Sequence, residues 1–272
     1  MTSLPPSQQP VADVGVIGGS GFYSLLDDPY SVTVTTPFGA PSGELTCGTL
    51  AGRRVAFLPR HGVRHQFAPH TVPYPANLWA LRSVGVRQVV ALSAVGSLRP
   101  DWPAGTLVVP DQIVDRTHGR PGTFVAAGAG VTHISFADPY CPRGRAAAVV
   151  DGTARDGATF VIINGPRFSS RAESQEYQRN GWSIIGMTGM PEAVLARELA
   201  LCYTSLALVT DLDAGVEAGA GVTMAEVMSA FARNLPSLRA LLESTLENLP
   251  SEQGDCSCGA VYQDEPPRYP LP

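Results

Sequence analysis

The sequence of 272 residues fits one α/β domain, so a single domain is the default expectation. Its hydrophobic content of 44% and charged content of 16% are typical of a globular chain with a sizeable core. The formal net charge of -5, without basic clusters, argues against nucleic acid as the main partner. Lysine is absent from the chain, which excludes P-loop and Schiff-base mechanisms that require it.

The N-terminal residues Met1–Pro10 are polar and proline-rich and lack the charged start and apolar core of a signal peptide. Apolar runs all fall short of the roughly 20 residues that span a membrane. We therefore expect a soluble cytoplasmic protein without a membrane partner. The expected divisions are a flexible N-terminal segment at 1–11, one folded domain at 12–250 and a polar C-terminal tail at 251–272.

Strands and helices are expected to alternate along the chain. Short apolar runs bounded by turn residues predict strands at 14–17, 45–50, 53–58, 88–93, 106–110, 112–114, 159–164, 183–187 and 204–210. Helical patterns are expected at 77–84, 144–155, 170–179, 191–199 and 224–249. The last helix should begin at a capping box formed by Thr223 and Glu226, and Pro236 should kink it. This order predicts an α/β fold, with a mixed, mostly parallel twisted sheet flanked by helices.

Groups that bind anions are predicted at the ends of several strands. Arg60 and His61 close one apolar strand, and Arg presents a planar fork of donors that suits phosphate. Hydroxyls follow other strands at Ser20, Ser93 and Thr188. Each hydroxyl alone is more often a helix cap than a ligand. The carboxyl ends of parallel strands share one crevice, however, so together these groups favour a phosphate site.

A second set of residues suits a heteroaromatic leaving group. Phe168 and Ser169 lie on a short loop before a helix, and Asp211 and Asp213 follow an apolar strand. An aromatic ring can stack on a base, and a carboxyl group can transfer a proton to it. Turn chemistry for the two Asp residues and a core position for Phe168 remain open alternatives at this point.

The five cysteines do not form a framework-like pattern. Cys256 and Cys258 are too isolated in the sequence to form a metal site on their own, and we interpret them as two free thiols in a mobile tail. His61 and His65 are four residues apart without a neighbouring carboxylate, so no metal is expected there.

Several motifs together resemble the trimeric purine nucleoside phosphorylase superfamily, and within it the 5'-methylthioadenosine phosphorylase branch. They include G-V-I-G-G-S-G-F, L-P-R-H-G, A-V-G-S-L-R, G-P-R-F-S-S-R-A-E, G-M-T-G-M-P-E-A and T-D-L-D, and the resemblance covers about Val14 to Leu246. It implies a phosphate-dependent pentosyltransferase and a homotrimer. Inorganic phosphate would be the co-substrate, with no metal or organic cofactor.

The resemblance also implies a role for individual positions. Phosphate would be bound by Ser20, Arg60, His61, Ser93 and Thr188, with Ala94 lining the site. Met187 would meet the ribose, Phe168 would stack on the purine, and Asp211 and Asp213 would bind the base edge. The 5'-methylthio group would be surrounded by His65, His133, Met224 and Val227, some of them from a neighbouring subunit. Arg60, His61 and Asp211 would carry the catalysis.

The base edge favours adenine, because an Asp at 211 can accept from a 6-amino group and Ser169 does not demand a protonated N1. The expected reaction converts 5'-methylthioadenosine and phosphate to adenine and 5-methylthioribose 1-phosphate.

The G-M-T-G-M-P-E-A run also resembles bacterial methylthioinosine phosphorylases. A 6-oxopurine enzyme acting on methylthioinosine, inosine or guanosine is therefore the alternative, and a non-catalytic nucleoside-binding protein is a remote one.

Overall fold

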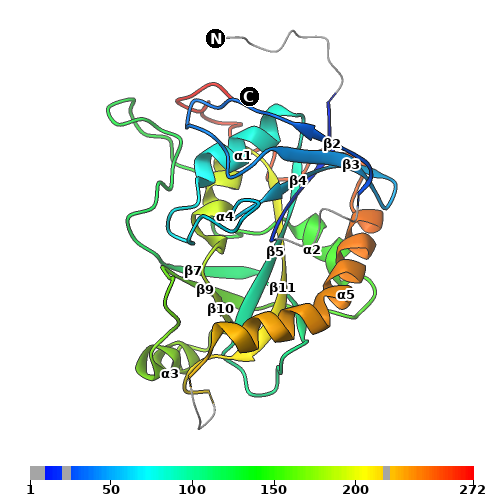
Figure 1. Ribbon diagram of the computed structural model, residues 1–272. Helices are drawn as coiled ribbons and strands as arrows, with labels where there is room; N and C mark the ends of the chain where they lie inside the picture. Colours follow the sequence, from blue (N-terminus) through cyan, green and yellow to red (C-terminus); the bar gives the residue numbers. More distant parts are fainter. Residues whose placement is uncertain (1–9, 20–25, 217–220) are drawn as a thin grey trace.

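A computed structural model of the chain describes residues 10–19, 26–216 and 221–272. In this part of the chain, eleven strands form one mixed sheet with five helices around it (Figure 1). The strands are β1 (Val14–Gly18), β2 (Asp27–Val32), β3 (Leu45–Leu50), β4 (Arg53–Pro59), β5 (Gln88–Ser97), β6 (Leu107–Val109), β7 (Gln112–Arg116), β8 (Arg155–Asp156), β9 (Thr159–Ile163), β10 (Ile184–Gly186) and β11 (Cys202–Leu212). The helices are α1 (Tyr74–Ser83), α2 (Pro142–Val149), α3 (Arg171–Arg179), α4 (Gly189–Glu198) and α5 (Met224–Asn248).

The sheet runs β2-β3-β4-β1-β5-β10-β9-β7, and β11 pairs with β5 and β6 beside this path. Pairs β1–β4, β1–β5, β5–β11 and β9–β10 are parallel, whereas β5–β10 and the β3–β4 hairpin are antiparallel. In the hairpin turn, Ala51 and Gly52 both have positive φ, at 49° and 71°. Two such residues match the type I′ turn that the strand twist favours. The predicted mixed α/β sheet is confirmed.

Helices cover both faces of the sheet. Neighbouring residues of β1 point to opposite sides, so Ile17 packs with Leu81 and Leu195 of α1 and α4, whereas Val16 packs in the cluster that contains Leu242 of α5. Figure 1 shows α1 and α4 on one side of these strands and α2 and α5 on the other. The long apolar strands therefore form the middle layer of three, as their continuous hydrophobicity predicts.

Capping boxes begin two of the helices. The predicted box of Thr223 with Glu226 starts α5, and Ser170 with Glu173 forms a second one at the start of α3. The helix predicted from residue 77 begins earlier, at Tyr74. The α5 helix contains Pro236 and bends along its length in Figure 1. The helix predicted at 144–155 is shorter than expected, because α2 ends at Val149 and residues 155–156 pair with β6 instead.

No helix in the described ranges has the length and apolarity needed to cross a membrane.

The strand predicted at 88–93 continues to Ser97 because it changes partner on one side. Its first half pairs in parallel with β1 up to Ala91, and its second half pairs antiparallel with β10 at Gly96 and Ser97. Ser93 therefore lies inside β5, at the change of partner, and its predicted place after a strand end is wrong. The position still adjoins the end of β1, which is what matters for the site.

The C-terminal segment packs against the domain. Cys256 and Cys258 are only 4% and 1% exposed, so their interpretation as thiols in a mobile tail is wrong. Tyr269 donates a hydrogen bond of 2.6 Å to the carbonyl oxygen of Glu198, and Arg82 donates one of 2.7 Å to that of Pro272. The polar composition of the segment concealed the few apolar and cysteine side chains that anchor it.

Candidate functional site

Arg60 lies immediately after β4 and is almost completely buried. Its Nε and one terminal nitrogen each donate a 2.8 Å hydrogen bond to the two carboxylate oxygens of Glu192, and the other terminal nitrogen donates one of 2.7 Å to the carbonyl of Leu92. Burial lowers the pKa of Arg60, but the Glu192 carboxylate outweighs it and the net shift is upward. Three of its five N–H donors are used in this way, and two remain for a ligand among the described residues.

Ser93 and Thr188 approach Arg60 from two directions. Arg60 contacts Leu92 next to Ser93, and it contacts Glu192 in α4, which follows Thr188 closely in the chain. The β10 strand runs antiparallel to β5, so its carboxyl end leads back toward Ser93. Met190 has non-helical φ and ψ of -119° and 139°, so a kink separates Thr188 from the turn that holds Glu192. The side chain of Thr188 makes no capping hydrogen bond, and its hydroxyl is therefore available to an anion.

His61 is held as a neutral imidazole. Its Nδ1 lies 2.8 Å from the carbonyl oxygen of Phe67, which places the proton on Nδ1 and leaves Nε2 as an acceptor. Burial lowers the pKa of His61 to about 4, and the Arg60 charge adds to this effect. The ring stacks on His65 with a centroid distance of 4.6 Å. Nε2 of the neutral His61 can therefore accept a hydrogen bond from a protonated phosphate oxygen.

Two further positions, Ser20 and Ala94, were predicted to adjoin the phosphate. Ser20 lies outside the described residues, and its role stays a prediction. Gly19, which precedes it, directly follows β1, and the backbone N–H of Arg60 donates to the Gly18 carbonyl at 2.9 Å. Ala94 is exposed, in agreement with a residue that lines an open site.

A register shift in β11 sets the direction of the Asp211 side chain. The pairing with β5 shifts between Val209 and Asp211, so Thr210 is an extra residue in the strand. The hydroxyl of Thr210 lies 2.8 Å from Oδ2 of Asp211, to which it donates. Asp211 pairs with Gly96, where an added Cβ would lie 3.0 Å from Oδ1 of Asp211. Gly96 thus leaves the space that this carboxyl group occupies.

Burial raises the pKa of Asp211 to about 6, and Asp213 and Glu226 add to the increase. The Thr210 hydrogen bond opposes this effect without cancelling it. The pKa of Asp213 is raised as well, mainly by burial. Two neighbouring carboxyl groups with raised pKa values can hold a proton near neutral pH.

Oγ of Ser169 and Oδ2 of Asp213 are both buried, and in the described part of the chain they form no hydrogen bond of normal geometry. Ser169 and Ser174 nevertheless interact with the Asp213 carboxyl and oppose the rise in its pKa. Both Ser169 and Asp213 belong to the predicted base-binding set, and Phe168 beside Ser169 is half-buried. The Ser169 hydroxyl and the Asp213 carboxyl thus form a buried polar edge that suits a polar ligand.

Met187 lies between the two groups of residues. Its carbonyl oxygen accepts a 2.8 Å hydrogen bond from Arg120, which also binds the carbonyls of Asn164 and Met190 at 2.7 and 2.5 Å. Gly165, with φ of 61°, packs so closely on Met187 that a Cβ would lie 2.5 Å from its sulfur. Arg120 and Gly165 therefore fix the loop that carries Phe168 against the loop that carries Thr188.

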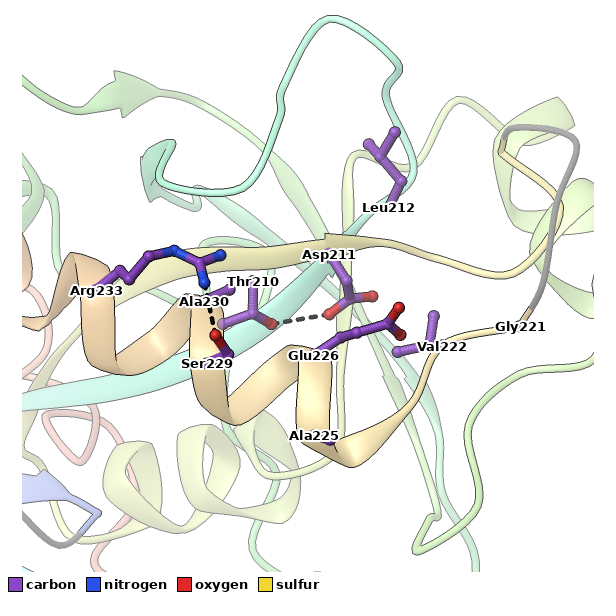
Figure 2. A pocket seen from close by; sticks show the side chains of 10 residues that line it. All are labelled: Thr210, Asp211, Leu212, Gly221, Val222, Ala225, Glu226, Ser229, Ala230 and Arg233. Atoms are coloured by element: carbon purple, nitrogen blue, oxygen red, sulfur yellow. Dashed lines mark hydrogen bonds between the residues drawn. The ribbon is translucent and has the colours of Figure 1, made fainter.

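An open cavity of about 620 Å³ lies between the end of β11 and the start of α5. Figure 2 shows Asp211 pointing into it toward Glu226, with Arg233 and Ser229 further along α5. Arg60, Ser93 and Thr188 do not line this cavity. It adjoins the base-edge carboxyl groups rather than the phosphate residues.

In the described part of the chain, the residues predicted around the 5' substituent do not close a pocket. His65, His133 and Met224 are exposed, and Val227 is partly buried at the start of α5. The structure thus groups Arg60, Ser93 and Thr188, and separately Asp211, Asp213 and Ser169, but it does not bring the 5' residues together.

Sequence reasoning missed the residues that orient the predicted ones. Glu192 and Tyr203 are the main examples, since the Tyr203 hydroxyl donates to the same Glu192 carboxylate at 2.8 Å. Glu192 stands in the first turn of a helix, where an acidic residue is usual, so its pattern gave no functional signal. Arg120 and Gly96 were also missed, because their roles depend on chain segments distant in the sequence.

Comparison with known proteins identifies the family of this chain. Residues 13–247 match the Phosphorylase superfamily. The chain belongs to this superfamily. This phosphorylase is 55% identical to the purine nucleoside phosphorylase of Streptomyces coelicolor, over 96% of the chain and 98% of the relative. It is also 55% identical to the S-methyl-5'-thioadenosine phosphorylase of Mycolicibacterium smegmatis, over 90% and 94%.

A solved methylthioadenosine phosphorylase from Schistosoma mansoni, in complex with adenine, superposes on this phosphorylase with a TM-score of 0.82. The two are 35% identical, and the match covers 86% of this chain and 91% of the other. The family that the sequence motifs resemble is confirmed.

The Glu192→Gln variant should unfold more easily than the wild type. It leaves the buried Arg60 guanidinium without an anion, and breaking a buried ion pair in this way costs about 3–5 kcal/mol. Inorganic phosphate should restore part of the loss if it binds Arg60. Denaturant unfolding with and without phosphate measures both effects.

Asp101→Asn is the matched control, because it breaks the exposed Arg99–Asp101 pair instead. This control should leave the midpoint of unfolding unchanged. If both substitutions lowered the midpoint of unfolding equally, the buried Arg60–Glu192 pair would stabilise the fold no more than the exposed Arg99–Asp101 pair does.

Proposed function

We propose that this phosphorylase cleaves 5'-methylthioadenosine with phosphate, giving adenine and 5-methylthioribose 1-phosphate. The observation that carries the proposal is the position of the two residue groups along β5. Arg60 contacts β5 next to Ser93, whereas Asp211 pairs with Gly96 three residues further on. Three residues of a strand span about 10 Å, which suits a phosphate at one end and a purine at the other, with ribose between them.

Phosphate is the nucleophile in this proposal. Arg60 supplies two N–H donors, and Ser93 and Thr188 supply hydroxyls. These groups hold the anion on one face of the ribose, where an oxygen attacks the anomeric carbon as the N-glycosidic bond breaks. The bound anion also stabilises the positive charge that develops on the ribosyl group. Neutral His61 accepts a hydrogen bond from a phosphate O–H, and its low pKa means that this proton stays on the phosphate as the new C–O bond forms.

The leaving purine takes the electrons of the broken C–N bond. Asp211 in its protonated form donates its proton to N7 of the base, so adenine leaves as a neutral molecule. The raised pKa of Asp211 keeps this proton available near neutral pH. Asp213 and Ser169 offer buried polar atoms to the base edge, and Phe168 offers a ring face. Metal and organic cofactors are not needed for these steps, and the expectation that none takes part stays a prediction.

The choice of adenine rests on residues at the base edge. The two bacterial relatives carry different names at the same 55% identity, so overall similarity does not decide between bases. Asp211 and Asp213 provide carboxyl oxygens that accept from a 6-amino group, whereas a 6-oxopurine would require a donor at O6. The adenine complex of the Schistosoma mansoni relative supports the same choice.

We also propose a homotrimer, in which a neighbouring subunit completes the 5' pocket. Its support is that His65, His133 and Met224 are exposed in one subunit, together with the apolar side chains Val63 and Val131. Light scattering of the purified protein distinguishes a trimer from a monomer. The cytoplasmic location stays a prediction from the sequence.

Base release from methylthioadenosine and methylthioinosine, with and without phosphate, tests the function. We expect phosphate-dependent adenine from the first substrate and little hypoxanthine from the second. In the Asp211→Asn variant, adenine release should fall about 10²–10⁴-fold through loss of the proton donor, and the preference should shift toward hypoxanthine. Hypoxanthine release by the wild type alone would favour the 6-oxopurine alternative, and binding without turnover would favour a sensor.

The pH dependence should report Asp211. Its raised pKa means that the proton-donating form persists up to about pH 6 and is lost as the pH rises through that value. The ratio of wild-type to Asp211→Asn kcat/KM should therefore fall above pH 6. Taking the ratio cancels the titration of phosphate itself. A ratio that is constant from pH 5 to about pH 8 would contradict a protonated Asp211.

Gly96→Ala should impair catalysis by displacing Asp211. The added Cβ would lie 3.0 Å from Oδ1 of Asp211 and from Cγ2 of Ile185. A shift of about 1 Å can reduce the rate roughly 100-fold. Gly122→Ala is the control, since its Cβ meets only Pro191 at 3.9 Å. Steady-state kinetics of both variants check this expectation, and near-normal activity of Gly96→Ala would contradict it.

A further inference from the structure

Four of the five cysteines meet at one place at the start of β11. Cys141 caps α2, Cys202 begins β11, and Cys256 and Cys258 belong to the C-terminal segment. Their exposures are 1%, 4%, 4% and 1%, and they form a cluster of their own. The sequence places these residues in three separate segments, so only the fold brings the four thiols together.

The sulfur positions suit a tetrahedral metal site. All four Sγ atoms lie within 4.8 Å of one another, and those of Cys141 and Cys256 are 3.6 Å apart. Four thiolates at about 2.3 Å from a zinc ion would be about 3.8 Å apart. A disulfide requires about 2.05 Å. The thiols are therefore spaced as metal ligands rather than as bonded pairs.

The surroundings also suit thiolates. The backbone N–H of Gly144 donates to Sγ of Cys141, and the side-chain amide of Gln253 donates to Sγ of Cys202, both at 3.5 Å. Hydrogen bonds to ligating sulfurs are the usual outer shell of a metal site.

We propose that Cys141, Cys202, Cys256 and Cys258 bind one Zn²⁺ ion in a closed structural site. All four ligands come from the protein, which leaves no open position for substrate and excludes a catalytic role for this ion. The site joins the C-terminal segment to the start of β11, the strand that ends at Asp211. A bound zinc ion would differ from the sequence-based expectation that the protein holds no metal. The zinc proposal does not depend on the reaction proposed above.

Metal analysis of the full-length protein, purified without a histidine tag, tests this proposal. We expect one zinc per chain by elemental analysis and by native mass spectrometry. The Cys258→Ser variant should lose the zinc and melt at a lower temperature. Cys47→Ser is the matched control, because Cys47 is equally buried but lies outside the cluster, where burial raises the pKa of its thiol to about 11. This variant should keep its zinc.

X-ray absorption at the zinc edge of the wild type keeps the test decisive if Cys258→Ser does not fold. Four sulfur neighbours at about 2.3 Å are expected. Zinc-free protein with four titratable thiols, or with a mass lowered by disulfide formation, would overturn the proposal. Iron in place of zinc would overturn the assignment of the metal. None of these results depends on whether the protein cleaves a nucleoside.

Discussion

The buried ion pair of Arg60 and Glu192 is the interaction on which the rest of the site depends. A guanidinium group is expensive to bury, and here its charge is neutralised by a carboxylate that is itself completely buried. The pair ties together four elements, since Arg60 follows β4, Glu192 lies in α4, Leu92 of β5 accepts from Arg60, and Tyr203 of β11 donates to Glu192. Two N–H donors of Arg60 stay available, so the pair also supplies a fixed positive group where a phosphate would bind.

The base-edge carboxyl groups depend on a different physical effect. Asp211 has no cationic partner in the described part of the chain, and burial is what raises its pKa. A strand irregularity at Thr210 and the absence of a side chain at Gly96 give the carboxyl its position. One end of the site therefore stabilises negative charge, whereas the other holds a proton. This asymmetry is what a reaction with an anionic nucleophile and a basic leaving group requires.

Much of this arrangement could be predicted from the sequence, because local chemistry determines it. The β3–β4 hairpin and both capping boxes follow from short patterns, and apolar strands indicated the covered sheet. Glu192, Gly96 and the cysteine cluster could not be predicted, since each acts through partners far away in the chain. Ser93 was assigned to a strand end because the antiparallel pairing of β10, which extends β5, has no signal in the sequence. The C-terminal segment was misread for the same reason, since its anchors contact α1, α4 and β11, which lie far from it in the sequence.

The most direct test of the account is a crystal structure of the protein with phosphate and adenine bound together. The account predicts a phosphate ion within hydrogen-bond distance of Arg60, Ser93 and Thr188. It also predicts adenine with its edge on Asp211 and Asp213, and with a gap the size of ribose beside Met187. Phosphate bound away from Arg60, or adenine turned so that Asp211 does not reach N7, would contradict the division of the site into an anion end and a proton-donating end.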